Sequence, residues 1–212
     1  MKAKKVMFYC LLGLAAGCVP IVSLHPLFAK DDIVFDDKLL GAWLGDANDP
    51  GTSWEFSRFE ESAAAYLPKE LQGEFKRVYR LNLANKDGQR GALAACLVKL
   101  ADRRFLDIFP DQFPSGESDM EKMKLGFNAF FYLPCHTFVR VDAVGDQLKI
   151  HFTDDDELKK LVEAEPKAVA HTVTEEHLVL TASTKELQAF VVKYADDKRL
   201  FAHELVLARK SK

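Results

Sequence analysis

The sequence predicts a mainly β domain with minor α content: an antiparallel barrel or strongly curved sheet with helices packed outside, after an N-terminal export segment. Three observations support this. Short runs alternate between apolar and polar residues, tight-turn residues separate several of them, and one segment near the C-terminus has helical periodicity instead. A hydrophobic content of 48% with 16 Phe is sufficient for a substantial core.

The N-terminus carries the features of an export signal. Three lysines in the first five residues precede the uncharged run Val6–Ala16, and small residues then lead to Cys18. Ala16-Gly17-Cys18 resembles the lipobox of bacterial lipoproteins. The resemblance implies that residues 1–17 are a signal peptide and that Cys18 becomes the new N-terminus, with a diacylglyceryl group on its thiol and three acyl chains, such as palmitate, in all. The alternatives are an ordinary secretory signal and an uncleaved anchor.

The same resemblance also implies a cellular location. Because Val19, and not Asp, follows the cysteine, it favours the outer membrane facing the periplasm where the cell has one. Removal of residues 1–17 would take away three lysines and no acids, leaving 26 basic against 32 acidic residues, a net charge of −6. An acidic domain is repelled by anionic lipid, and the sequence has no basic stripe of the kind that binds nucleic acid. We therefore expect attachment through the acyl anchor and no nucleic-acid partner.

Residues 18–30 are predicted to form a tether, stiffened by Pro20 and Pro26. Residues 31–212 are the length of a single β-rich domain. Its strand-like runs cover residues 53–59, 75–84, 93–100, 105–109, 136–143, 147–153, 168–174, 177–180 and 200–209. The run 105–109 is apolar on both faces except at Asp107, so we expect another layer to cover its outside.

The runs 136–143 and 147–153 predict a hairpin whose register can be tested. With Gly145-Asp146 as the two turn residues, each pair of facing residues has the same sum of numbers. The expected pairs are Val141 with Ile150, Arg140 with His151, and Asp142 with Lys149. A slip of one residue would place apolar side chains opposite polar ones, so the register should be well determined.

Two segments predict helices. The first, 153–165, begins with three acids and ends at Pro166. The second, 183–194, begins with the capping box Ser183–Glu186. Its apolar face consists of Leu187, Phe190, Val191 and Tyr194. We expect this face to dock on the outside of the sheet, against Phe138.

Two insertions interrupt the strand pattern. Residues 60–73 are rich in Ala and Glu and predict a short helix broken at Pro68. Residues 110–131 form a long connection with a helical part. We expect its aromatic residues to pack in the core, and the alternative is that the helical part caps a barrel end or rests near lipid.

Leu40-Gly41-Ala42-Trp43 resembles the G-x-W opening of lipocalin-like (calycin) barrels. The resemblance implies that Trp43 plugs one end of the barrel and that the basic side chain of Arg209 stacks on it. The alternative is that Trp43 is an ordinary core aromatic. The chain as a whole also resembles uncharacterised bacterial lipoproteins that share the cysteine and a His-Pro-Leu segment, here residues 25–27.

Two cysteines, Cys96 and Cys135, remain after processing. An oxidising periplasm permits a disulfide between them. The alternative is two buried thiols, which the apolar run around Cys96 favours, and the sequence does not supply the geometry that a disulfide needs.

Motifs for nucleotide binding, hydrolysis and metal binding are absent, and the histidines are scattered. No cofactor or metal is expected. We therefore expect a noncatalytic binding or scaffold module for a protein partner or a small apolar ligand. The alternative is a hydrolase-like envelope enzyme with a dispersed site that uses Asp107 or His136. An open apolar interior would favour a carrier, a filled interior a scaffold, and a cleft with a coupled, buried Asp and His would favour catalysis.

Overall fold

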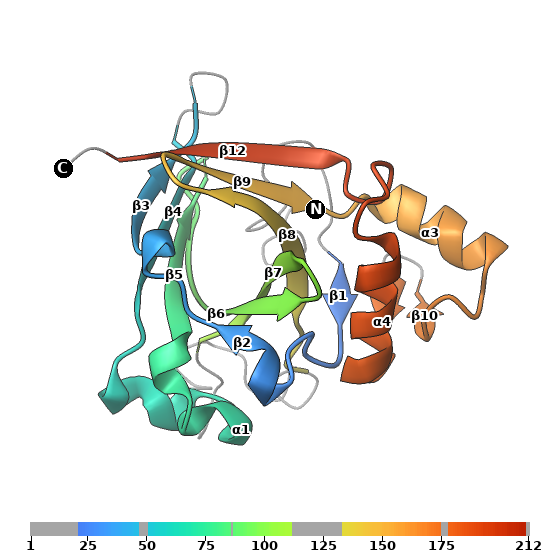
Figure 1. Cartoon of the computed structure of the whole chain (residues 1–212), viewed down its shortest axis with the longest axis horizontal. Coiled ribbons are helices and arrows are strands. Elements are labelled where there is room, and N and C mark those ends of the chain that lie inside the picture. Colours follow the sequence, from blue (N-terminus) through green and yellow to red (C-terminus); the bar gives the residue numbers. More distant parts are fainter. Residues whose placement is uncertain (1–20, 47–50, 86, 112–132, 175–177, 211–212) are drawn as a thin grey trace, which may run out of the picture.

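The computed structural model describes residues 21–46, 51–85, 87–111, 133–174 and 178–210. Eight strands close into an antiparallel barrel (Figure 1). They are β3 (Gly41–Leu44), β4 (Ser53–Arg58), β5 (Val78–Ala84), β6 (Arg90–Leu100), β7 (Arg103–Pro110), β8 (Thr137–Val144), β9 (Gln147–Phe152) and β12 (His203–Arg209). The pairings β12–β3 and β6–β7 close the ring. The predicted fold class is confirmed, and the closed barrel is consistent with a lipocalin-like architecture.

The inside of the barrel is a solvent-excluded apolar core. Alternate residues of every strand point inward, as closure of a sheet requires. The inward set comprises Leu39 and Trp43, Trp54, Phe56, Tyr79, Leu81, Leu83, Ala95, Leu97, Leu106, Ile108, Val139, Val141, Leu148, Ile150, Leu205 and Leu207. The four large aromatic rings among them are at most 3% exposed. Side chains therefore occupy the space that a ligand would take in an open barrel.

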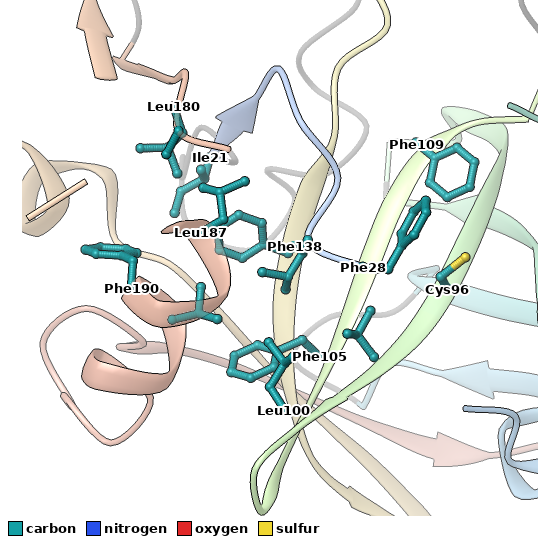
Figure 2. Close-up of a cluster of buried hydrophobic side chains, with 14 of the residues drawn as sticks. Ile21, Phe28, Cys96, Leu100, Phe105, Phe109, Phe138, Leu180, Leu187 and Phe190 are labelled. Carbon is teal, nitrogen blue, oxygen red and sulfur yellow. The ribbon is translucent and has the colours of Figure 1, made fainter. Parts of the chain in front are cut away.

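A second apolar core lies outside the barrel, on β7 and β8. Phe105, Phe109 and Phe138 point outward from these strands and join one buried cluster. The cluster also receives side chains from α3 (Asp155–Ala164) and α4 (Thr184–Tyr194). Figure 2 shows Phe138 beside Leu187 of α4, with Phe105 below them. The expected cover over β7 and the expected docking face of α4 are both present.

A small sheet completes this outer layer. It has three strands in the order β1 (Val22–Ser23), β11 (Leu178–Leu180) and β10 (His171–Val173), and β1 runs parallel to β11. Ser23 also forms an isolated antiparallel bridge with His136. A two-residue strand, β2 (Ile33–Val34), pairs with Leu97 and Val98 near the C-terminal end of β6. The N-terminal segment is thus joined both to the small sheet and to the barrel.

This placement corrects the expected tether at residues 18–30. Within its described part, Ile21, Leu27 and Phe28 are buried in the outer core. The prolines of this segment indicate a stiff linker, but its apolar side chains gain more by burial than by exposure in a linker. The described residues 21–30 therefore belong to the folded domain.

The β8–β9 hairpin has the predicted register only in part. Arg140 faces His151 and Val141 faces Ile150, as expected. Beyond them a β-bulge at Asp142 shifts the pairing, and Ala143 faces Lys149 where Asp142 was expected. The Asp142 carboxylate lies 2.7 Å from Arg140 Nε and 2.8 Å from His151 Nε2. The salt bridge to Arg140 and the close contact with His151 hold the Asp142 side chain at the bulge, whose extra residue the alternation of side chains does not encode.

The described helices follow the predicted boundaries closely. The 60–73 insertion contains a 3₁₀ helix, Glu61–Tyr66, and α1 (Lys69–Gln72), with Pro68 between them. Helix α4 begins with the predicted capping box, since Ser183 and Glu186 each bind the other's backbone amide. Of the connection 110–131, in which a helix was expected, only Pro110 and Asp111 lie within the described residues, and Pro110 belongs to β7.

Candidate functional site

Asp107 and His136, the two residues named for the enzyme alternative, meet in the outer core. Asp107 Oδ1 lies 2.8 Å from His136 Nδ1, and the two side chains are 0% and 10% exposed. Asp107 points away from the barrel interior because its neighbours Leu106 and Ile108 point inward. It faces Phe138 across β7 and β8, so His136, two residues before Phe138, lies diagonally opposite on the same face.

The other carboxylate oxygen of Asp107 binds the N-terminal segment. The Leu27 N–H donates to Asp107 Oδ2 at 2.6 Å, across a sequence separation of 80 residues. The backbone of His136 exchanges two hydrogen bonds with Ser23, both 2.8 Å long. Together these contacts fix residues 23 to 27 against β7 and β8. The Asp107–His136 pair is therefore an attachment point for the N-terminal segment.

Aromatic rings surround the pair. The His136 ring lies 5.1 Å from the Phe109 ring and 6.0 Å from the Phe28 ring, measured between centroids. Phe28 is 4% exposed. In Figure 2 the Phe28 and Phe109 rings lie side by side on the outer face of the barrel. An apolar wall and the bound Leu27 amide thus occupy the positions from which a substrate would approach Asp107.

The thiol of Cys96 lies near Asp107 and His136, so the three residue types of a Cys–His–Asp triad are present. The thiol is nevertheless not activated as a nucleophile. Cys96 on β6 pairs directly with Asp107 on β7, and its side chain is buried. Burial, and secondarily the Asp107 charge, raises the pKa of the Cys96 thiol well above its ordinary value. The thiol stays protonated at neutral pH, whereas a nucleophilic cysteine needs a lowered pKa.

Cys96 and Cys135 are separate free thiols in this structure. Cys135 is partly exposed, and its partial burial raises the pKa of its thiol. The expectation of two buried thiols therefore describes Cys96 but not Cys135.

Trp43 and Arg209 are in contact at one end of the barrel. The Arg209 guanidinium carbon lies 4.1 Å from the centre of the Trp43 ring, and the two residues pair between β12 and β3. Trp43 is fully buried, and its indole N–H donates to the Leu39 carbonyl at 2.8 Å. Arg209 Nη1 donates to the Leu40 carbonyl at 3.0 Å and Nη2 to the Lys38 carbonyl. Arg209 thus ties the last strand to the segment that opens the barrel.

Gly41 has a conformational reason to be glycine in this motif. Its φ is +112°, a region that L side chains rarely adopt. The positive φ turns the chain from the 3₁₀ helix Asp37–Leu39 into β3. The turn carries the Leu39 and Leu40 carbonyls to their indole and guanidinium donors.

The remaining candidates are spread over the molecule. Cys18, the predicted lipidation site, lies outside the described residues. The Asp154 side chain accepts the Glu157 amide as the cap of α3 and also lies 2.9 Å from His203 Nε2. Within the described ranges, no three His, Cys, Asp or Glu side chains converge enough to hold a metal ion. None of the helices in the same ranges reaches the length and hydrophobicity needed to cross a bilayer.

The sequence named Asp107 and His136 separately but did not predict that they pair. One signal could have done so. Asp107 is the single polar residue in an otherwise apolar run, and a buried carboxylate requires hydrogen-bond partners. If 105–109 pairs with 136–143, His136 is the histidine within diagonal reach. Ser23 and Leu27 carry no such signal, because they contribute backbone groups.

Comparison with known proteins adds no relative. A scan against models of protein families, a search of curated proteins and a search of solved structures each found no match. The class that the fold and site define is a closed antiparallel barrel with an outer helical layer pinned to its N-terminal segment.

Proposed function

We propose that this protein is a lipid-anchored lipoprotein of the bacterial cell envelope whose barrel is a noncatalytic scaffold for a protein partner. The observation that favours a scaffold over a ligand carrier is the filled interior of the barrel. All eight strands contribute to a core in which Trp43, Trp54 and Phe56 are almost inaccessible to solvent. A carrier of apolar ligands needs a cavity that such side chains do not fill. The outer surface is then the part offered to a partner.

The anchor is supported by the sequence. The basic start, the apolar run and Ala16-Gly17-Cys18 are the pattern of a lipoprotein signal, and the acidic domain would not hold an anionic bilayer by charge. One acyl chain binds a membrane only reversibly, and two or more hold it stably. By the same resemblance, the proposed location is the outer membrane facing the periplasm.

The hydrolase alternative would have to use Asp107 and His136, and their surroundings favour a structural role. Asp107 is bound on both oxygens, and the neighbouring Cys96 thiol has a raised pKa. A general base needs to reach a substrate proton within hydrogen-bond distance. The Leu27 N–H already donates to Asp107 Oδ2, so a substrate proton cannot take that position.

Two experiments test the proposal. In the native host, wild-type protein should incorporate a labelled palmitate analogue and sediment with membranes, whereas Cys18→Ser should do neither. Retention of Cys18→Ser on membranes to the same extent would overturn the anchor. Native mass spectrometry of protein purified from its own cells should show the acylated chain alone or with a protein subunit. A stoichiometric small apolar ligand would overturn the scaffold and support a carrier.

A further inference from the structure

Side chains of α4 and β7 bind the main chain of the N-terminal segment. The Leu27 N–H donates to Asp107 Oδ2 at 2.6 Å, and Gln188 Nε2 donates to the Leu27 carbonyl at 2.9 Å. Thr184 Oγ1 donates to the Pro26 carbonyl at 2.8 Å. Asp107, Thr184 and Gln188 thus form a clamp on three consecutive polar groups of the main chain.

The segment also places two apolar side chains beside the clamp. Leu27 is 0% and Phe28 4% exposed, and both belong to the outer core. The centroid of the Phe28 ring lies 6.0 Å from that of Phe109, and Figure 2 shows the two rings side by side. The residues before and after this stretch, 24–25 and 29–30, are exposed. The bound stretch is therefore short and apolar, and it is limited on both sides.

This combination of contacts is typical of a site that binds peptides. Main-chain hydrogen bonds supply affinity that does not depend on sequence, and apolar positions select the side chains. The first residue of the bound stretch, Pro26, has no N–H and needs no acceptor. Thr184 and Gln188 lie outside the apolar face by which α4 docks, so their contribution is to bind the segment.

We propose that the clamp is a peptide-binding site occupied by the chain's own N-terminal segment, and that a partner enters it with an apolar segment that replaces the resident one. The inference rests on the proposed scaffold function and gives that function a docking site. The matching partner segment has a proline followed by two large apolar residues, because this is the sequence that the site binds in the folded chain.

The replacement of one segment by the other is nearly balanced in free energy. An incoming segment remakes the hydrogen bonds to the clamp and refills the positions of Leu27 and Phe28. It has to overcome the effective concentration of the resident segment, which is about millimolar for a short linker. A free peptide therefore competes poorly, whereas a partner with further contacts outside the clamp competes well.

A labelled peptide tests the proposal by fluorescence anisotropy. The probe is a synthetic peptide of residues 21–30 that carries fluorescein on the side chain of Lys30, which is 63% exposed in the protein. It is titrated with full-length wild-type protein and with Leu27→Asp, whose charged side chain cannot occupy the buried position of Leu27. Leu24→Asp is the matched control, because Leu24 belongs to the same segment and is 37% exposed.

We expect Leu27→Asp to bind the probe with an affinity at least about tenfold higher than wild type and Leu24→Asp, whose sites remain occupied. A second peptide, methylated at the Leu27 nitrogen, lacks the donor to Asp107 and should bind about tenfold more weakly. Equal binding of the two peptides would overturn the role of the clamp. Absence of binding to Leu27→Asp protein that melts cooperatively would overturn the peptide site, and the scaffold would still stand on its own test by native mass spectrometry.

A cleaved form replaces Leu27→Asp if that variant does not fold. A protease site is inserted between Ala29 and Lys30, both exposed, in the full-length wild-type chain. Cleavage of the folded protein leaves the N-terminal segment held by noncovalent contacts alone, so the probe should exchange into the site. Folded, cleaved protein that does not take up the probe would likewise overturn the proposal.

Discussion

Replacing Asp107 with alanine tests whether the buried carboxylate holds the N-terminal segment in place. The change removes the acceptor of the Leu27 N–H and the partner of His136 Nδ1. Leaving a buried amide without an acceptor costs about 1–3 kcal/mol. Removing one member of a buried polar or ionic pair costs about 3–5 kcal/mol in all. We expect the free energy of unfolding to fall by about 3–5 kcal/mol.

The assay combines urea unfolding with amide hydrogen exchange. In the Asp107→Ala protein the amides of Ser23 and Leu27 should exchange much faster, because both belong to the released segment. Asp107→Asn keeps an oxygen that can accept the Leu27 N–H, so its loss should be smaller, about 1–2 kcal/mol. Asp37→Ala is the matched control for removing a carboxylate, since the Asp37–Arg58 pair is exposed. That control should cost less than about 1 kcal/mol.

A loss of less than about 1 kcal/mol in Asp107→Ala, or unchanged exchange at the Leu27 amide, would mean that Asp107 does not hold the N-terminal segment. A large loss of stability with unchanged exchange at Leu27 would also count against it, because the carboxylate would then support the barrel and not the N-terminal segment.

Three further predictions concern other parts of the fold. Trp43→Ala should lower the free energy of unfolding by about 3–5 kcal/mol in urea, because the ring is fully buried under Arg209; a loss below about 1 would argue against a plug. Phe190→Asp should lower the melting temperature by about 10 °C or more, whereas Ala189→Asp on the exposed side of α4 should leave it almost unchanged; equal melting curves would mean that α4 is not docked. Hydrogen bonds from the Arg199 side chain and backbone lower the pKa of Asp197 to about 2. The stabilisation from Asp197 is therefore complete above about pH 4 and is lost as the pH falls through about 2. Asp197→Asn should remove this part of the acid sensitivity in urea titrations, and an unchanged profile would contradict the assignment.

Local rules were sufficient for much of the fold. The Ser183–Glu186 capping box depends only on two side chains three residues apart, and the helix begins there. The apolar outer face of 105–109 required a covering layer, and α4 is part of that layer. Many short alternating runs predicted an antiparallel barrel or a strongly curved sheet, and the structure shows the closed form.

Features that depend on distant partners could not be predicted. The N-terminal segment looks like a linker because its composition does not reveal that Leu27 will find Asp107 or that Val22 will find Val179. The bulge at Asp142 depends on side-chain contacts with Arg140 and His151, which the alternation of apolar residues ignores. The Asp107–His136 pair needed the β7–β8 register, which was not assigned in advance.

The parallel pairing of β1 with β11 has a consequence for the order of folding. Val22 cannot find Val179 until almost the whole chain has been synthesised, and such long-range parallel pairing forms slowly. The segment made first is therefore expected to be among the last to dock, after the local β8–β9 hairpin. Pulse-labelling hydrogen exchange should show the amides of that hairpin protected before those of Ser23 and Leu27. Until then, the outer apolar rows of β7 and β8 are exposed to any chaperone that meets the nascent chain.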